Sequence, residues 1–482
     1  MASSLPPVVR HLPSDAEIRE LLADQIDVQH KSVGMVVGII TPEGRRVVSH
    51  GSTSRDGGHA VGGDTAFEIA SVTKVFTSLL LVEMVERGEV AFDDPLARFL
   101  PADVHVPQRK GRHITLVDLA THTSGLPPQP PDLLGLDDPI APTYSVEQLY
   151  SSLSSYRLTR DIGAEWEYGN LDMALLGHAL ARRAGTDHET LLRARITGPL
   201  GLSRTSTVGA SLGPDVAVSH DSDLHPTDRL AMGALAPAGA MMSSANDLLT
   251  LLGACLGLIP SPVAPALHAM SRTRRSMRPP LLTMMRRYGR VMLRMAFSRR
   301  LRSRTSPVFS RVEQALGWYV LGRGSEEMVV HDGAGPSCAA SIAYDATARA
   351  GVVVLTNAGI TVQDISRHLL WRDSPLARPR KQVTLNSGVL DRYVGTYQSP
   401  ASPLFEILRG GDRLFIRPQY PRRACHDPEA TRIHACRLPV RQGNDPAKGG
   451  ISIEPPARSD RIHRLSNRIL TRSRSHTEHW QR

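Results

Sequence analysis

Strand-like sequence lies near both ends of this chain, and helix-like sequence lies between them. The apolar run at 33–40, a turn at 41–44 and the residues 46–50 together predict a hairpin. Further strands are predicted late in the chain, at 317–323, 328–331, 338–345 and 351–357. We therefore expect an α+β fold. Its antiparallel sheet is assembled from both chain ends and flanked by helices, and an all-helical region is inserted between its strands.

Helices are predicted where apolar residues recur every three to four positions. The first covers 14–28 and begins at Ser14, a residue type that caps helix N-termini. The others lie at 72–87, 114–122, 170–184, 244–258 and 362–371. Most of them fall between the early hairpin and the late strands, which places the helical region in the middle of the chain.

The composition is that of an ordinary globular protein, with 41% hydrophobic and 22% charged residues in a chain of 482. The four cysteines form no Cys-x-x-Cys pair, which argues against zinc and thioredoxin-type sites, and we expect no metal or other cofactor. No apolar run near the N-terminus is long enough for a signal peptide, and none elsewhere reaches the roughly 18 residues of a transmembrane helix. These features favour a cytoplasmic protein.

Positive charge is concentrated in two segments. Residues 271–304 hold twelve arginines and no acidic residue, and residues 421–482 hold thirteen basic and six acidic residues. They contribute +12 and +7 to a net charge of +10, so the rest of the chain carries −9 and does not favour nucleic-acid binding. Residues 281–302 predict a basic amphipathic helix. Such a helix can contact an anionic membrane peripherally or pack as an insertion beside a cleft.

The tetrapeptide Ser71-Val-Thr-Lys74 begins one of the predicted helices. A serine and a lysine three residues apart lie one turn apart on the same face of a helix. The serine can then act as a nucleophile, and the lysine as the base that removes its proton. Burial and the positive end of the helix dipole both disfavour a charged lysine, which suits it to that role. The same tetrapeptide also fits a capped surface helix with an exposed lysine.

Two further motifs combine residues that could handle protons or bind substrate. Tyr168-Gly-Asn170 opens a helix, where a tyrosine hydroxyl and an amide can project into a cleft. Its alternative reading is a core tyrosine followed by a helix-capping asparagine. His331-Asp-Gly333 lies between two predicted strands, and its small residues allow a substrate to approach the backbone. Its alternative is an ordinary tight turn.

In order and context, the three motifs resemble those of the serine β-lactamase/penicillin-binding-protein superfamily. Within it they are similar to the class C β-lactamase-related serine hydrolases, which include the family VIII esterases. The matching pairs are Ser71 and Lys74 for Ser-x-x-Lys, Tyr168 and Asn170 for Tyr-x-Asn, and His331 and Gly333 for His-x-Gly. The resemblance covers about 15–370 and implies a β-lactamase/transpeptidase-like fold.

The resemblance implies a catalytic role for several of these residues. Ser71 attacks a carbonyl carbon, while Lys74 and Tyr168 share the proton handling of acylation and deacylation. Asn170 orients the substrate amide or ester. The backbone N–H groups of Ser71 and Ala334 form the oxyanion hole.

The third motif departs from the β-lactamase pattern. The resemblance places His331 beside the cleft, where it lines the site and tunes the network of Lys74 and Tyr168. Classical β-lactamases carry Lys-Thr where this chain has His331 and Asp332. A mostly neutral histidine next to an aspartate binds a substrate carboxylate poorly near pH 7. We therefore expect an esterase-like serine hydrolase that acts on a small-molecule ester or amide through an acyl-enzyme. A β-lactamase, a D-amino-acid peptidase or DD-carboxypeptidase, and a non-catalytic binding protein on the same fold stay open as alternatives.

The sequence pattern divides the chain into four parts. They are a flexible N-terminus at 1–14, a serine hydrolase domain at 15–375 with a basic insertion at 271–304, a partial β domain at 386–420 and a disordered tail at 421–482. The partial domain resembles the opening of a small β-barrel that follows this hydrolase fold, with a hairpin at 405–417. Strand alternation stops after it, while Arg, His and Pro increase, which predicts the disorder of the tail.

Overall fold

The computed structural model describes residues 12–133, 144–272 except for 222 and 230, 275–277, 309–377, 387–398, 404–410, 413–419 and 471–472. The chain divides into two compact units, Met1–Ala377 and Arg378–Arg482. Three predicted features lie outside the described residues, entirely or in large part. They are the flexible N-terminus at 1–14, the basic helix at 281–302 and the tail at 421–482.

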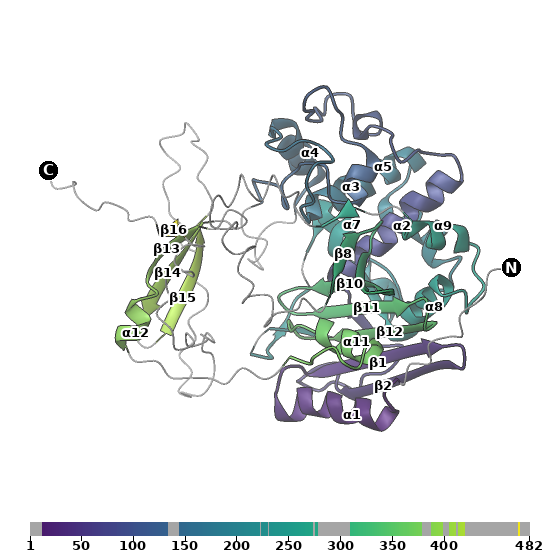
Figure 1. The fold of residues 1–482 in the computed structure, drawn as a ribbon, viewed down its shortest axis with the longest axis vertical. Helices are drawn as coiled ribbons and strands as arrows, with labels where there is room; N and C mark the ends of the chain where they lie inside the picture. The colour runs from purple at the N-terminus through teal and green to yellow at the C-terminus, as the bar shows by residue number, and fades with distance from the viewer. Residues whose placement is uncertain are drawn as a thin grey trace. The chain divides into compact units, whose positions relative to one another are not determined.

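The first unit is built on an eight-stranded antiparallel sheet with the strand order β2-β1-β12-β11-β10-β9-β8-β7. Its strands are β1 (Gly34–Thr41), β2 (Gly44–Gly51), β7 (Arg275–Ser276), β8 (Arg311–Gln314), β9 (Tyr319–Arg323), β10 (Glu326–Ala334), β11 (Ala339–Asp345) and β12 (Ala350–Thr356). β1 pairs with β12, with Met35 opposite Thr356 (Figure 1). The sheet is therefore assembled from both chain ends, and the predicted α+β fold is confirmed.

β1 is buried on both faces because its sequence, Gly-Met-Val-Val-Gly-Ile-Ile-Thr, is apolar throughout. Met35, Val37 and Ile39 face one side of the sheet, and Val36 and Ile40 face the other. This alternation lets one strand contribute to two separate layers of core.

One face of the sheet is covered by α1 (Asp15–Ala23) and α11 (Gln363–Leu370). Ser14 caps α1 in a capping box with Glu17, and the helix continues as a π-turn, η1 (Asp24–Val28), so the predicted helix at 14–28 has two parts. Ile18 of α1 and Trp371, at the end of α11, belong to the apolar cluster on this face.

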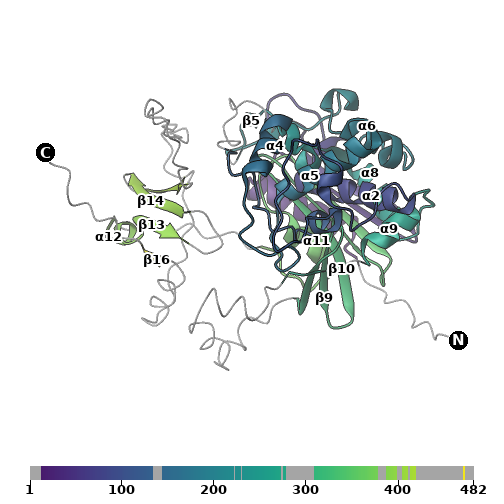
Figure 2. The same cartoon turned by 90° about the horizontal axis from the view of Figure 1, so that it is seen from above.

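The opposite face carries the helical region, and Figure 2 shows α2, α4, α5 and α6 gathered together there. The helices of this region are α2 (Thr73–Glu86), α3 (Leu116–Ala120), α4 (Val146–Ser155), α5 (Asn170–Ala184), α6 (His188–Leu192), α7 (Ala236–Gly239), α8 (Ala245–Cys255) and α9 (Ala264–Met270). α8 lies directly on the sheet: a Cβ added to Gly38 of β1 would come within 2.8 Å of Leu249. The absence of a side chain at Gly38 therefore permits this close packing.

Helix α2 runs through the core of the helical region. Twelve of its fourteen residues are buried, from Thr73 to Met84, because the sequence is apolar around the whole circumference of the helix. At its N-terminus, the 3₁₀ turn η2 (Ala70–Val72) contacts β10 and β11. The short strand β3 (Ala66–Glu68) precedes this turn and pairs with β6 (Met242–Ser244). The start of α2 is thereby held at the junction of the sheet and the helical region.

The second unit contains α12 (Ser387–Asp391) and a four-stranded antiparallel sheet with the order β15-β14-β13-β16. Its strands are β13 (Gly395–Gln398), β14 (Leu404–Gly410), β15 (Arg413–Gln419) and β16 (Thr471–Arg472). β14 and β15 pair with Leu408 opposite Phe415, at the place where the sequence predicts a hairpin.

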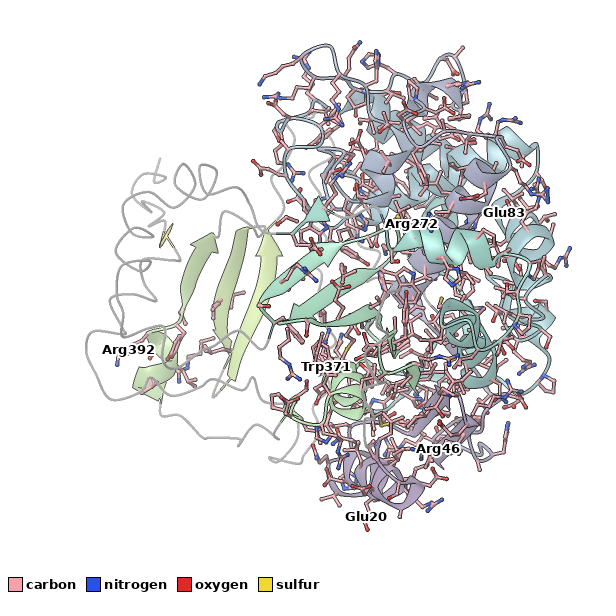
Figure 3. All side chains as sticks on the ribbon, turned by 45° about the vertical axis from the view of Figure 1, so that its right-hand side comes forward. Glu20, Arg46, Glu83, Arg272, Trp371 and Arg392 are labelled. Atoms are coloured by element: carbon pink, nitrogen blue, oxygen red, sulfur yellow. The ribbon has the colours of Figure 1, made fainter. Side chains whose placement is uncertain are left out.

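Glu20 of α1 and Arg46 of β2 are charged side chains on the outside of the first unit (Figure 3). Among the described residues, no helix combines the length and the apolar character needed to cross a membrane.

Candidate active site

Ser71 lies in the 3₁₀ turn η2, between strand β3 and helix α2. The preceding residue, Ala70, has a φ of 43°, in the left-handed region that residues with a side chain seldom adopt. Such strain persists only where the surroundings impose it, and it occurs often at functional sites. Here β6 pairs with β3 on one side of the turn, and β10 packs against Ile69 and Ala70 on the other.

Lys74 directs its ammonium group at Ser71. Its Nζ lies 2.9 Å from Ser71 Oγ, 2.7 Å from Asn170 Oδ1 and 2.7 Å from the backbone oxygen of Ala238. Three acceptors match the three N–H groups of a charged lysine. When the amine is neutral, its lone pair is free to accept the Ser71 proton.

Lys74 is fully buried. The alternative interpretation of this motif, a surface helix with an exposed lysine, is therefore wrong. Burial lowers the pKa of Lys74 from 10.5 to about 7. Its three hydrogen-bond partners are uncharged, so none of them offsets the desolvation of the ammonium group. Near neutral pH the side chain is therefore divided between its charged and neutral forms.

Tyr168 reaches Ser71 from the loop that precedes α5. Its hydroxyl forms a hydrogen bond with Ser71, and Lys74 Nζ lies 4.8 Å from the centroid of its ring. Burial raises the pKa of Tyr168, the charge of Asp332 raises it further, and the bond with Ser71 offsets only part of this. The phenol is therefore protonated near neutral pH. It can relay a proton, but it does not supply a phenolate base.

Asn170 is the first residue of α5, and its side chain faces Lys74 instead of capping the helix. Its backbone N–H donates to the carbonyl of Pro128 at 2.8 Å, which ties the start of α5 to the 121–128 loop. Tyr168 and Asn170 therefore converge on Ser71 and Lys74, as the sequence predicts.

The third motif lies within a strand, because β10 extends to Ala334. The sequence places this motif after the end of a strand at 331, and that boundary is wrong. Asp332 pairs with Ser341 and Gly333 with Ala340 in the ladder between β10 and β11. Backbone pairing with β11 outweighs the weak strand preference of aspartate and glycine here.

His331 is buried behind Tyr319. The two rings stack with their centroids 5.1 Å apart and an interplanar angle of 16°. His331 Nδ1 donates to the backbone oxygen of Asp332 at 2.9 Å, which places the ring proton on that nitrogen. Burial, together with the charge of Lys74, lowers the pKa of His331 to about 3, so the ring is neutral.

Asp332 points to the opposite face of β10. One of its carboxylate oxygens accepts from Ser341 Oγ at 2.7 Å, and the other pairs with Arg367 of α11 at 2.7 Å. Asp332 therefore binds the sheet to α11 and does not face Ser71. Of the two residues that stand where β-lactamases carry Lys-Thr, only His331 lies on the side of the candidate site.

Gly333 allows β10 to lie directly against the turn that carries Ser71. A Cβ at this position would come 2.1 Å from the backbone oxygen of Ile69. The next residue, Ala334, follows the alternation of an antiparallel ladder. Because the N–H of Gly335 donates to Cys338 at 2.9 Å, the N–H of Ala334 points away from β11. This orientation keeps the Ala334 N–H out of the ladder with β11.

A cavity of about 80 Å³ adjoins Ser71. Its wall is formed by the nucleophile turn, by Asn170, by residues of the 232–239 segment and by the backbone stretch 334–338. Among the described residues that line it, the only charged side chain is that of Glu68. The cavity is therefore small, and none of its described lining residues is a cation that could bind a carboxylate.

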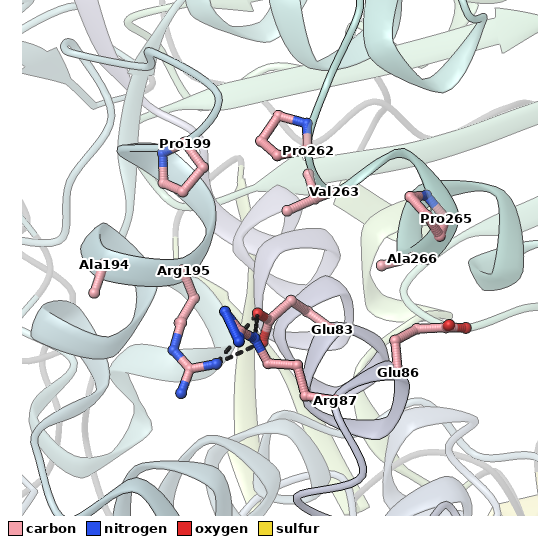
Figure 4. A pocket seen from close by; sticks show the side chains of 10 residues that line it. All are labelled: Glu83, Glu86, Arg87, Ala194, Arg195, Pro199, Pro262, Val263, Pro265 and Ala266. Atoms are coloured by element: carbon pink, nitrogen blue, oxygen red, sulfur yellow. Dashed lines mark hydrogen bonds and ion pairs between the residues drawn. The ribbon is translucent and has the colours of Figure 1, made fainter.

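A second, larger hollow of about 320 Å³ lies at the other end of α2 (Figure 4). Glu83 pairs there with Arg87 and Arg195, and Arg195 also binds Glu89 at 3.0 Å. Its charged groups thus largely neutralise one another. Glu83 is nine residues beyond Lys74, or roughly 13 Å along the helix, so this hollow is separate from the Ser71 site.

Sequence reasoning gave no role to His122, which holds the Tyr168 loop in three ways. Its backbone oxygen accepts from the N–H of Glu167 at 2.9 Å, and its Nδ1 accepts from the N–H of Gly169 at 3.4 Å. Its ring lies 4.8 Å from that of Tyr168, between centroids. The sequence holds the motif His122-Thr-Ser-Gly-Leu, but spacing along the chain does not connect this motif to Tyr168.

The backbone carbonyl of Ala238, which accepts a hydrogen bond from Lys74, was also not predicted, because every residue type offers such a group.

In the described part of the chain, no group of three or more His, Cys, Asp or Glu side chains is placed to hold a metal ion.

A serine and a buried lysine at the start of a central helix, beside an antiparallel sheet, define a β-lactamase-like site. Residues 15–373 match the model of the Beta-lactamase family, and the chain belongs to this family. It is thereby a member of the serine β-lactamase/penicillin-binding-protein superfamily.

Two curated relatives are similar over part of their length. The D-alanyl-D-alanine-carboxypeptidase/endopeptidase AmpH of Escherichia coli is 35% identical over 191 residues, which cover 40% of this chain and 49% of AmpH. The esterase EstB of Burkholderia gladioli is 30% identical over 243 residues, covering 47% of this chain and 60% of EstB. The chain thus spans about half the length of the curated relatives it matches.

Among solved structures, a class C β-lactamase from Rhodobacter sphaeroides superposes with a TM-score of 0.57 at 24% identity. The match covers 75% of this chain and 98% of that structure. At this level of identity, the likeness concerns the fold.

Proposed function

We propose that this protein is an esterase-like serine hydrolase that cleaves small uncharged esters or amides through an acyl-enzyme on Ser71. The observation that carries this proposal is the buried Lys74, whose Nζ lies 2.9 Å from Ser71 Oγ and whose pKa is lowered to about 7. A base with a pKa near the ambient pH is suited to general base catalysis.

Acylation begins when neutral Lys74 accepts the proton of Ser71 while the serine oxygen bonds to the substrate carbonyl carbon. The N–H groups of Ser71 and Ala334 stabilise the negative charge that develops on the carbonyl oxygen. When the carbon–oxygen or carbon–nitrogen bond to the leaving group breaks, the proton passes from Lys74, through the protonated Tyr168, to the departing atom. Water then attacks the acyl-enzyme by the same route in reverse and regenerates Ser71.

Two features favour an uncharged substrate. The cavity beside Ser71 has Glu68 as its only charged lining residue in the described part of the chain, so a substrate carboxylate finds no partner there. The third-motif residue His331 is neutral and stacked behind Tyr319, so it does not supply the positive charge either. A carboxylate-bearing β-lactam or D-alanyl peptide therefore fits this site less well than a simple ester.

The test compares wild type with Ser71→Ala on short-chain p-nitrophenyl esters, on nitrocefin and on D-amino-acid amides. We expect Ser71-dependent ester hydrolysis and labelling of Ser71 by a fluorophosphonate probe. Ester turnover that survives Ser71→Ala would contradict the assignment of the nucleophile. Failure of Ser71 to react with the probe, with no turnover of any substrate, would favour a non-catalytic protein on this fold.

A β-lactamase or D-amino-acid peptidase activity is the second candidate, and the similarity to AmpH supports it. Turnover of nitrocefin or of a D-alanyl peptide with kcat/KM above that of every ester would favour it over the esterase.

A further inference from the structure

The cavity beside Ser71 occupies one side of the nucleophile only. Asn170, Met232 and Gly239 contribute to its wall, whereas Tyr168, Tyr319 and His331 do not. The aromatic residues instead lie together outside this wall. The ring centroids of Tyr168 and Tyr319 are 6.4 Å apart, and His331 stacks on Tyr319.

This arrangement suggests different positions for the leaving group and the acyl group of a substrate. The leaving group takes up a proton as it departs, so it must lie within reach of Tyr168, through which the proton passes and which does not line the cavity. The acyl group remains bonded to Ser71 and extends in the other direction. We infer that the 80 Å³ cavity is the acyl pocket, and that Met232 and Gly239 restrict the substrates to esters of short acyl chains. This inference rests on the proposed function.

The size of the cavity limits the acyl group. A buried apolar cavity of about 150 Å³ is large enough to bind benzene. The space beside Ser71 is about half of that, which suits acyl groups of two to four carbons. Longer chains must displace part of the wall, and displacing a well-packed wall is unfavourable.

Met232 and Gly239 form a part of the wall where one substitution can enlarge the cavity and another can narrow it. Met232 is buried, with 8% of its surface exposed, and its Cε would lie 3.2 Å from a Cβ placed on Gly239. Shortening Met232 therefore opens the cavity, whereas adding a methyl group at Gly239 narrows it. Both changes concern apolar atoms, so they alter the shape of the pocket without altering its charge.

The test measures kcat/KM on p-nitrophenyl esters from acetate to octanoate for wild type, Met232→Ala and Gly239→Ala. Each methylene newly buried in Met232→Ala should raise kcat/KM about fourfold. We therefore expect the ratio of hexanoate to acetate to rise about 15-fold, for two methylenes. In Gly239→Ala, we expect the ratio of butanoate to acetate to fall by about fourfold or more.

Met35→Ala is the matched control, because it removes a fully buried methionine from the opposite face of the sheet. It should leave the dependence on acyl-chain length as in wild type. Thermal unfolding of each variant establishes that it is folded at the assay temperature, and Gly239→Ala provides an independent test if Met232→Ala is not.

A second ester series keeps the acetyl group and lengthens the alcohol. Met232→Ala should leave the dependence on alcohol length unchanged. If it changes the alcohol dependence and leaves the acyl dependence alone, the cavity accepts the leaving group and the inference is wrong. Ser71-dependent turnover with wild-type acyl profiles in both variants would also overturn the acyl pocket while leaving the hydrolase assignment intact. Absence of Ser71-dependent turnover on all esters would instead contradict the proposed function.

Discussion

Lys74 is a lysine without a charged partner at its hydrogen bonds, and it is fully buried. Burial lowers the pKa of Lys74 to about 7, and no charged hydrogen-bond partner offsets this effect. A group with this pKa can take a proton from Ser71 and return it within one reaction cycle. The burial that makes a charged lysine unfavourable is therefore also what suits Lys74 to the proposed role of a base.

The first prediction concerns pH. Only neutral Lys74 can accept a proton, and its neutral fraction rises as the pH increases through about 7. We expect kcat/KM for an ester to rise about tenfold between pH 6 and pH 8, following a single ionisation. His122 and His331 do not titrate in this range, because the pKa of each is lowered to about 3.

The measurement is kcat/KM at constant ionic strength, together with the rate at which a fluorophosphonate labels Ser71. The labelling rate reports activation of the serine without depending on the leaving group of an ester. A flat profile between pH 6 and pH 8, or one that falls, would contradict the role of Lys74 as the base.

The second prediction concerns His122, which positions Tyr168 through Gly169 and through ring contact. In His122→Ala the N–H of Gly169 loses its acceptor, and the Tyr168 ring loses one supporting face. Because a misplacement of about 1 Å can cost roughly 100-fold in rate, we expect kcat to fall about 10- to 100-fold with little change in KM.

The control for this prediction is His188→Ala. His188 is also a buried histidine whose pKa is lowered to about 3, but it contacts Thr77 of α2 at 3.2 Å instead of the Tyr168 loop. It should lose stability without a comparable loss of kcat. A change confined to KM in His122→Ala would mean that His122 shapes substrate binding and does not position Tyr168.

At the residue scale, the sequence predicts the convergence of Ser71, Lys74, Tyr168 and Asn170, because each of them lies at or just before the start of a helix and carries a distinctive side chain. It does not predict the part played by His122. That contact depends on the path of two loops, and spacing along the chain carries no information about it. The sequence also does not predict which face of the sheet the Asp332 side chain occupies, because that depends on where β10 ends.

Strand β10 links the candidate active site to the rest of the sheet. Successive side chains alternate between its faces, so His331 turns toward Tyr319 and Asp332 toward Arg367. Gly333 then turns toward the nucleophile turn, with no side chain to hold the two backbones apart. One strand therefore supports the ring cluster, anchors α11 and sets the distance between Ser71 and Ala334.

The third prediction tests this close approach with Gly333→Ala. The new Cβ would meet the backbone oxygen of Ile69 at 2.1 Å, so the strand and the turn must separate. We expect a loss of about 1–3 kcal/mol in the free energy of unfolding, and a loss of at least 100-fold in kcat/KM because the oxyanion donors move apart.

Gly322→Ala in the neighbouring strand β9 is the matched control. Its Cβ would meet only the side chain of Arg311, at 3.1 Å, and an arginine side chain can move aside. Wild-type kcat/KM in Gly333→Ala would show that Ser71 does not depend on this contact. Chemical denaturation and ester hydrolysis are measured on both variants.

At the scale of elements, the apolar patterns predict most helices and sheet strands to within a few residues, and α5 (Asn170–Ala184) has the predicted bounds. The apolar patterns do not predict strands whose existence or length depends on pairing with another strand. β3 and β6 are strands of three residues that exist because they pair with each other. β10 continues through Asp332 and Gly333 because β11 provides partners for its backbone.

The chain divides into two compact units, and the described apolar clusters belong to the first of them. The two main apolar clusters of the first unit draw all their buried members from Ile18 to Trp371. One cluster lies between the sheet and α1 and α11, and the other fills the helical region. Among the described residues, the buried members of both clusters and the residues of the candidate site all belong to the first unit.

The last prediction follows from this distribution of the core residues. A chain that ends at Ala377, the boundary of the first unit, should fold and keep the ester hydrolysis of the full chain. We expect kcat/KM within about twofold of the full chain, because neither the Ser71 site nor the apolar clusters lose a member. The thermal unfolding transition of the first unit should also keep its midpoint, since no part of its core is removed.

The control is Ser71→Ala in the same truncated chain, which establishes that the remaining hydrolysis comes from this site. Aggregation of the truncated chain, or a fall of more than tenfold in kcat/KM with the fold intact, would contradict the independence of the first unit. The second of these results would mean that residues beyond Ala377 contribute to substrate binding, because a folded first unit would then lack only those residues.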